Sequence, residues 1–364
     1  MIEKTLVTNL KNRKGFNVFD SAIATIAFVV LQFGFIFVYS LVPARVRSID
    51  AIGYIASIGV ECTFLIASYV TAKFRNVDFV SATKIKKKIN WPIVGFCLLL
   101  AFVTIVSFSS LTNIFLYILE SAGYTYTGSD IVINDFFTYI IYLIVSCAIP
   151  AITEEILFRG TICAGLEKSN NKHLAVWVSA LVFMLMHGSP NQTVHQFILG
   201  VIFGYIFVYT GNLWITILIH FFNNAIAVSI TYFSSLTASA TSSSAGVEPM
   251  GALALAFNII YGLAMAAVGV MIVIAIIKAI KKQLDKIKLK GKKEQVHSDV
   301  LASESETIKV DDEDVVVVDS QDIIAKQNNE ETKKEMIGTI ICYTLAGAIL
   351  IFEWVASLIS GFIV

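Results

Sequence analysis

Nine apolar segments dominate the sequence, and most of them reach the length of about 20 residues that a helix needs to cross a bilayer. Inside a bilayer the backbone must satisfy its own hydrogen bonds, so segments of this kind fold as helices. The chain is 56% apolar and only 15% charged, whereas soluble domains carry about 25% charged residues. We therefore expect an all-α polytopic membrane protein, a bundle of about eight to nine transmembrane helices. The segments are residues 18–42, 51–72, 91–111, 136–158, 173–188, 193–210, 213–233, 251–277 and 336–364.

The basic residues predict how this bundle is oriented. Of the 27 Lys and Arg side chains, all but Arg45 and Arg47 fall in four stretches. With nine spans and a cytosolic N-terminus, all four stretches lie inside, as the positive-inside rule requires, and the C-terminus lies outside. Eight spans stay open as an alternative, because the segments 173–188 and 193–210 are short. The four basic stretches are residues 1–16, 73–90, 159–172 and 278–335.

The same pattern divides the chain into five parts. The longest polar stretch is Lys-rich at first and acidic afterwards, a composition that predicts a charged, mostly disordered cytosolic linker. Its Lys-rich beginning is also able to extend a helix along an anionic membrane surface. The parts are residues 1–135 (N-terminal membrane helices), 136–233 (a core with the polar motifs), 234–277 (outer loop and membrane helix), 278–335 (linker) and 336–364 (C-terminal membrane helix).

Ionisable side chains inside apolar helices are energetically costly, so each one is a candidate functional residue. Most of those in this chain lie between residues 154 and 224. Glu61 and Glu353 also lie within apolar segments, but far from the motifs in sequence, and we do not assign them to the site. They could pair with Ser, Thr or Tyr of neighbouring helices, or line a substrate path. The candidate site consists of Glu154, Glu155, Arg159, Phe183, His187, His220 and Asn224.

The spacing of these residues predicts which side chains share a helix face. Glu155 and Arg159 are four residues apart with the acid first, the favourable order for an ion pair. Glu154 then points about 100° away and is free to face another helix. The pairs Phe183 with His187 and His220 with Asn224 also share a face. Three helices thus each present a polar stripe, and packing these stripes together inside the bundle is the cheapest arrangement.

A carboxylate, two imidazoles and a carboxamide around one point can hydrolyse a peptide bond. A poorly solvated Glu154 is suited to take a proton from water, and an imidazole beside it can orient that water. The other groups can donate hydrogen bonds to the developing oxyanion. Glu154, His187 and His220 could instead bind Zn²⁺ and leave one position open for water. The sequence does not separate the metal-free chemistry, which we favour, from the zinc variant.

Three motifs in this order carry a family resemblance. The sequence reads EExxxR at 154–159, FxxxH at 183–187 and HxxxN at 220–224, with Gly-Asn-Leu-Trp at 211–214 before the last motif. Over about residues 136–233 it resembles the CPBP family, the type II CAAX prenyl endopeptidases and their bacterial relatives labelled as bacteriocin-processing or immunity proteins. The other spans match that family only in being membrane helices.

The resemblance implies an intramembrane endopeptidase that uses a glutamate-activated water. Carried over by motif, Glu154 is the base and His187 lies beside the water, while His220 and Asn224 form the oxyanion site. Glu155, Arg159 and Phe183 support this geometry by the same resemblance. No cofactor is then required, although zinc remains possible. We expect the site to lie about 10 Å below the cytosolic surface, with Arg159 at the inner boundary and helix 173–188 beginning in the cytosolic layer.

The expected partners are a peptide or protein substrate, which can itself be membrane-associated, and membrane lipids, with no nucleic acid. The bias toward Lys, Ile, Asn and Phe suggests a multi-pass protein of a bacterial plasma membrane. Prenylated substrates are not expected there, so we favour cleavage of a secreted or leader-bearing peptide, or a regulatory cleavage. A non-catalytic adaptor or bacteriocin immunity protein that binds a peptide in the same cavity is the alternative function. A transporter is a third, but no symmetry between the two halves supports it.

Overall fold

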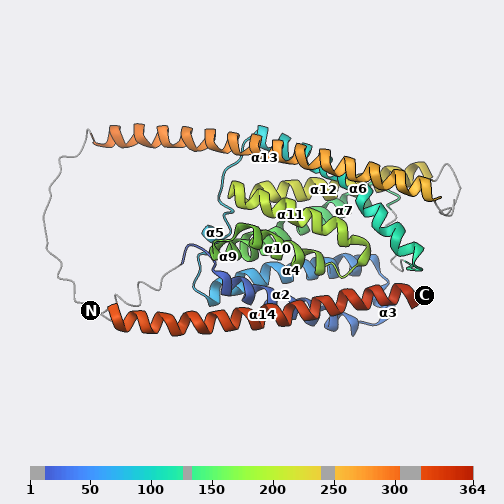
Figure 1. Ribbon diagram of the computed structural model, residues 1–364, viewed down its shortest axis with the longest axis horizontal. Coiled ribbons are helices and arrows are strands. Elements are labelled where there is room, and N and C mark those ends of the chain that lie inside the picture. The colour runs from blue at the N-terminus through green and yellow to red at the C-terminus, as the bar shows by residue number, and fades with distance from the viewer. Residues whose placement is uncertain (1–12, 126–132, 239–250, 304–320, 364) are drawn as a thin grey trace.

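The computed structural model describes residues 13–125, 133–238, 251–303 and 321–363, and within these ranges the fold is built from helices without strands (Figure 1). Eight helices in these ranges are long and apolar enough to cross a membrane, as the sequence predicted. The elements are α2 (Val18–Ser40), α3 (Ala44–Arg47), α4 (Asp50–Phe74), α5 (Phe79–Ala82), α6 (Trp91–Ser121), α7 (Phe136–Tyr142), η1 (Leu143–Ala148), α8 (Ile149–Glu155), η2 (Ile156–Cys163), α9 (Ala164–Leu166), η3 (Glu167–Ser169), α10 (Lys172–Leu185), η4 (Pro190–Gln192), α11 (Thr193–Thr210), α12 (Leu213–Ala238), α13 (Ala252–Ser303) and α14 (Gln321–Ile363).

Helix α10 explains the uncertainty between eight and nine spans. It has 14 residues, which at 1.5 Å per residue is about 21 Å and less than a bilayer core. It forms a hairpin with α11, whose far end returns to the basic loop before α6. There Asn212 donates to the carbonyl of Lys88 (3.2 Å) and the indole of Trp214 donates to the carbonyl of Ile85 (2.7 Å). If both helices of the hairpin are counted as spans, or if neither is, the other helices keep the same orientation in the membrane.

A buried acid at the start of α2 joins three helices near the basic loops. The side chain of Asp20 is fully buried and accepts hydrogen bonds from Arg13 (2.9 Å) and Arg75 (2.7 Å). Arg75 also pairs with Glu335 near the start of the apolar part of α14. The Asp20 side chain also accepts a hydrogen bond from the backbone, because Asn17 and Asp20 form a reciprocal capping box at the start of α2. The network holds the beginning of α2, the end of α4 and α14 together.

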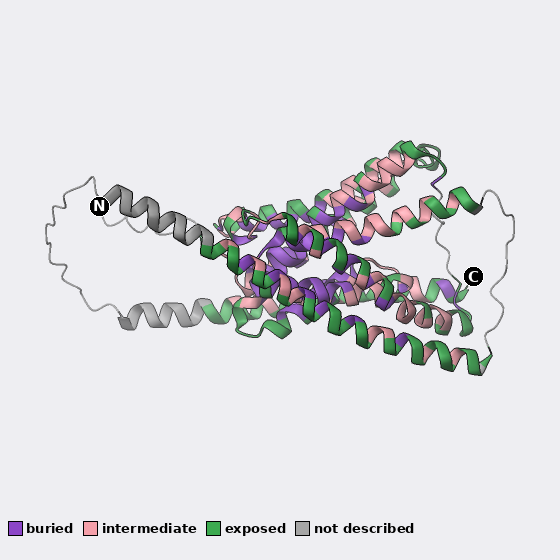
Figure 2. Ribbon diagram, turned by 90° about the horizontal axis from the view of Figure 1, so that it is seen from above, coloured by how far each residue is buried: buried purple, intermediate pink, exposed green. Residues whose placement is uncertain are grey.

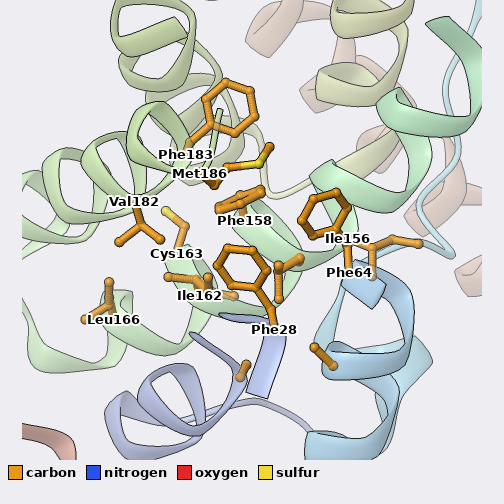
Figure 3. Packing of buried hydrophobic residues seen from close by; sticks show 14 of the residues in the cluster. Phe28, Phe64, Ile156, Phe158, Ile162, Cys163, Leu166, Val182, Phe183 and Met186 are labelled. Carbon is orange, nitrogen blue, oxygen red and sulfur yellow. The ribbon is translucent and has the colours of Figure 1, made fainter. Parts of the chain in front are cut away.

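The apolar core has two parts that meet at α11 and α12. One cluster joins α2, α4, the segment α8–η2 and α10, and the other joins α6, α11, α12 and α13. Buried residues gather where these helices cross, while the long outer helices are exposed along much of their length (Figure 2). In the first cluster, the ring of Phe158 packs against Phe28 (5.9 Å), Phe64 (6.1 Å) and Phe183 (5.1 Å), as Figure 3 shows. These rings hold the segment α8–η2, which we call the motif helix because it carries Glu154, Glu155 and Arg159, between α2, α4 and α10.

Two glycines let α10 and α11 approach closely. A Cβ atom added to Gly200 would lie 2.9 Å from the Cα of Ala180, and one added to Gly204 would lie 2.9 Å from a methyl of Val176. Small residues four apart are typical of close helix packing in membranes, where backbone approach replaces the hydrophobic effect as the driving force.

Replacing Gly200 with alanine is therefore expected to destabilise the hairpin. The new methyl group meets the backbone of α10, which cannot rotate away, and overpacking of this kind costs about 1–3 kcal/mol. The measurement is the thermal unfolding midpoint of the purified protein in detergent. Gly95→Ala on α6 is the matched control, because a Cβ there meets nothing within 4 Å. An unchanged midpoint for Gly200→Ala would show that α10 and α11 can move apart without loss of stability.

The linker predicted between residues 278 and 335 is partly helical. Helix α13 continues past the apolar segment to Ser303, and α14 begins at Gln321. Lys, Leu, Glu and Gln, which are abundant in these stretches, are all good helix formers. The placement of this helical part along a membrane surface stays a prediction, and residues 304–320 lie outside the described ranges. The outer loop predicted from residue 234 begins later, because α12 continues to Ala238.

Candidate active site

The two motif glutamates stand on a helix with unusual hydrogen bonding. From Phe136 to Ser169 the chain is one continuous helical span, but η1 and η2 are π-helical and flank the short α-helix α8 that ends at Glu155. The hydroxyl of Thr161 donates to the carbonyl of Ile156, five residues earlier (3.0 Å). π-helical turns are rare and occur frequently at functional sites.

Glu155 and Arg159 form the predicted ion pair. The Arg159 Nη1 atom donates to Glu155 Oε1 at 2.8 Å, and both side chains are fully buried. The Nη2 atom donates to the carbonyl of Gly200 on α11 (3.3 Å). The guanidinium also lies over the rings of Phe183 (4.4 Å) and Phe203 (5.2 Å), which is favourable for a cation in an apolar site.

His220 on α12 reaches both motif glutamates. Its Nδ1 atom lies 3.1 Å from Glu155 Oε1, the oxygen that also accepts from Arg159, and its Nε2 atom lies 3.9 Å from Glu154 Oε2. A carboxylate can only accept, so in the neutral imidazole the proton is on Nδ1 and Nε2 is a hydrogen-bond acceptor that faces Glu154. All three side chains are buried. The acid of one motif and the histidine of another therefore meet in space.

His187 lies on the other side of Phe183 and has a partner of its own. Its Nδ1 atom is 2.8 Å from the carbonyl of Phe183, so the proton is on Nδ1 and the Nε2 lone pair is available. The Phe183 ring contacts both imidazoles, with centroids 5.0 Å from His187 and 6.1 Å from His220. His220 thus lies next to Glu154, and the place of His187 beside the water, which the resemblance implies, stays a prediction.

Asn224 is bound to the motif helix. Its Nδ2 atom donates to the carbonyl of Ser146 in η1 (3.3 Å), which fixes the orientation of the carboxamide. An amide nitrogen carries two hydrogens, so one N–H remains for another acceptor. The neighbouring Asn223 is buried, and its Oδ1 atom accepts from Thr104 of α6 (3.5 Å).

The fold brings to this site an acid that the sequence did not assign to it. Glu61 on α4 lies 2.5 Å from the hydroxyl of Thr153, the residue before Glu154. Glu353 on α14 also lies near the site. A Cβ atom added to Gly188, the residue after His187, would lie 3.1 Å from the Oε1 atom of Glu353. The only signal in the sequence was that both acids lie within apolar segments, where charges are costly.

Arg159 was expected at the inner boundary of the membrane, and that depth stays a prediction. Its side chain is fully buried within the helix bundle, and the helix continues for seven more residues to Leu166. His220 is seven residues from Leu213, the start of α12, and so about 10 Å from the end that carries the basic loop. Helix α10 begins soon after η3, and its first residue, Lys172, lines a pocket together with Lys84. Its start in the cytosolic layer stays a prediction.

The arrangement does not fit a zinc site. Among the residues whose positions are described, no three His, Cys, Asp or Glu side chains converge in a way that could hold a metal ion. Glu154 and His220 are neighbours, and the Nδ1 proton of His187 is directed to a backbone carbonyl, which leaves its Nε2 lone pair free. Metal dependence of the reaction stays open to a chelation experiment.

Comparison with known proteins bears on the same stretch of chain. Residues 136–226 match the family described as Rce1-like, type II CAAX prenyl endopeptidase Rce1-like. The similarity to this family is confined to that segment. The Rce1-like segment contains all three motifs and ends just past Asn224, so the family match coincides with the site built above. The remaining helices lie outside it.

A curated relative that matches part of this chain is also named as a membrane peptidase. The Bacillus subtilis (strain 168) protein named "Putative membrane peptidase YdiL" is 28% identical over 86 residues, which is 24% of this chain. The match spans about a third of that relative, 35% of its length. No solved structure matches the chain significantly. The comparisons thus show that one segment of this chain, which has eight candidate membrane spans among its described residues, is similar to membrane peptidases.

Proposed function

We propose that the protein is an intramembrane endopeptidase that hydrolyses a peptide bond with water activated by Glu154. The observation that carries the proposal is the meeting of Glu154, Glu155 and His220 in one buried cluster. The Rce1-like segment supports it, because it contains these residues. The site would act about 10 Å from the cytosolic end of α12.

In this mechanism Glu154 removes a proton from water as the oxygen attacks the peptide carbonyl, and later delivers that proton to the leaving amine. His220 accepts a hydrogen bond from the same water through Nε2, because Glu155 holds the proton on Nδ1. Arg159 balances the charge of Glu155, so one carboxylate of the pair is neutralised. The free N–H of Asn224 donates to the oxyanion that develops on the carbonyl.

Glu61 enters the mechanism as a neutral neighbour of Glu154. The Thr153 hydroxyl lies 3.0 Å from the carbonyl of Ile149 and 2.5 Å from Glu61 Oε2. A hydroxyl has one proton and a carbonyl can only accept. Both contacts are hydrogen bonds at once when Thr153 donates to Ile149 and a protonated Glu61 donates to Thr153. A neutral Glu61 leaves Glu154 as the charged acid of this pair.

Glu61→Gln is accordingly expected to keep peptide hydrolysis within a few-fold of the wild type, because the amide can still donate to Thr153. Glu61→Leu removes the donor and leaves a buried hydroxyl oxygen without its partner, at a cost of about 1–3 kcal/mol. The measurement is the rate of cleavage together with the unfolding midpoint of each variant. If Glu61→Gln is as inactive as a change at Glu154, the ionised form of Glu61 is required and its neutral role is wrong.

The function itself is tested by following peptide termini. Purified wild type and His220→Ala are reconstituted in liposomes with a library of quenched fluorescent peptides, and new termini are identified by mass spectrometry. Cleavage by the wild type that is lost in His220→Ala is the expected result. A parallel sample with a zinc chelator should cleave normally if the chemistry is metal-free. Loss of cleavage there, restored by added Zn²⁺, would favour the metal variant.

The substrate class that we propose is a secreted or leader-bearing peptide, or a membrane protein cut for regulation, in a bacterial plasma membrane. A non-catalytic adaptor or immunity protein remains the second candidate, because the same cavity could bind a peptide without cutting it. The two differ in cells that express His220→Ala. An immunity or adaptor phenotype that survives the substitution, in the absence of cleavage by the wild type, would support the second function.

A further inference from the structure

A groove runs between α11 and α13 on the side of α11 that faces away from the candidate active site. It has a volume of about 610 Å³, and its walls come from α6, α10, α11 and α13. Helix α13 packs along α6 and touches α11 more lightly, and in Figure 1 it runs along the upper edge of the bundle. A cavity of this size accommodates a single elongated apolar group.

The groove changes from apolar to basic along its length. At one end Val270 lies near Phe108, and Ile274 and Ile277 continue the apolar wall along α13. At the other end the same helix presents Lys278 and Lys281. Eleven residues separate Val270 from Lys281, which is about 16 Å along a helix. An elongated occupant that is apolar over most of its length and anionic at one end matches this pattern.

By the orientation that the basic residues predict, the polar end lies at the cytosolic level of the bundle. His173, in the first turn of α10, lines this end, and its Nδ1 atom is 2.8 Å from the hydroxyl of Tyr205 on α11. No acidic side chain is present in the described lining of the groove. Basic pockets between membrane helices on the cytosolic side are suited to lipid phosphates, because the headgroups lie at that depth.

We propose that this groove binds an anionic phospholipid. One acyl chain lies along Val201 and Ile274, and the phosphate lies between Lys278 and Lys281. The opposite face of α11 carries Gly200 and Phe203, both of which contact Arg159. A bound lipid therefore braces the helix against which the buried ion pair is packed. The proposal does not depend on the protease activity, because it concerns binding alone.

The test uses the full-length chain in nanodiscs that contain equal amounts of phosphatidylglycerol and phosphatidylcholine, followed by native mass spectrometry of the released protein. The wild type is expected to retain more phosphatidylglycerol than phosphatidylcholine. Each lysine near the membrane surface contributes a factor of about five to the binding of an anionic lipid. The double variant Lys278→Gln/Lys281→Gln should lower retention accordingly, and Ile274→Trp should lower it by filling the apolar part.

Lys282→Gln/Lys286→Gln is the matched control, with the same charge change on the same helix but outside the groove. An equal loss in this control would overturn the proposal, because the preference would then come from general surface charge. Displacement of the lipid by inorganic phosphate, with Ile274→Trp unaffected, would also overturn it, since the site would then recognise phosphate alone. A peptide found in place of the lipid would do the same. Circular dichroism and size-exclusion profiles confirm that each variant is folded.

Discussion

Replacing Glu154 with glutamine is expected to lower the rate of peptide hydrolysis by about 10²–10⁴-fold, the range over which a positioned general base accelerates such a step. Glutamine has nearly the same shape but cannot take a proton from water. The Glu155–Arg159 pair and the contact of Glu155 with His220 do not involve Glu154, so the fold should be retained. The measurement is cleavage of the peptide library in liposomes, with the unfolding midpoint recorded for each sample.

The control for this prediction is Glu120→Gln, the same chemical change at an exposed position near the end of α6. It should cleave at the rate of the wild type. A Glu154→Gln variant that is folded and still cleaves within a few-fold of the wild type would remove the base from the mechanism. Glu61 and Glu353 would then be the next acids to test, because both lie near the motif helices.

Much of the bundle and one contact of the candidate site could be predicted from the sequence. Apolar segments of about 20 residues permit only a helix in a bilayer, and the structure has eight such spans in the described ranges. The spacing of Glu155 and Arg159 predicted an ion pair, and the distance of 2.8 Å confirms it. These features depend on neighbours along one helix, where spacing determines contact.

Contacts between helices that are distant in sequence could not be predicted in the same way. Glu61 precedes Thr153 by 92 positions. The periodicity of a helix does not show which faces of α4 and α8 pack together. The π-helical stretches around α8 also change the rotation of the helix, while the prediction assumed 3.6 residues per turn throughout. The contacts that bury Arg159 could not be predicted for the same reason, because they come from other helices. In the structure the Gly200 carbonyl and the rings of Phe183 and Phe203 stabilise it inside the core.

The second large effect is expected at Arg159 itself. Arg159→Met removes a fully buried cation and leaves the Glu155 carboxylate in the core with His220 as its remaining partner. Breaking a buried ion pair in this way costs about 3–5 kcal/mol, because the remaining charge is left uncompensated. We expect the unfolding midpoint in detergent to fall by several degrees and hydrolysis to fall with it. Arg159→Lys should be intermediate, because lysine keeps the charge but lacks the planar fork that reaches both Glu155 and the Gly200 carbonyl.

A double variant separates charge from packing in this prediction. Glu155→Gln/Arg159→Met removes both charges and keeps side chains of similar size, so most of the lost stability should return, as it does when buried ion pairs are replaced by matched neutral residues. Activity should stay low, because glutamine is a weaker partner than a carboxylate for the Nδ1 proton of His220. If the double variant is as unstable as Arg159→Met alone, the loss comes from the contacts of the guanidinium with Phe183 and Phe203 rather than from an unpaired Glu155. Recovery of stability without recovery of activity would separate the two roles of Glu155, as the partner of Arg159 and as the group that orients His220.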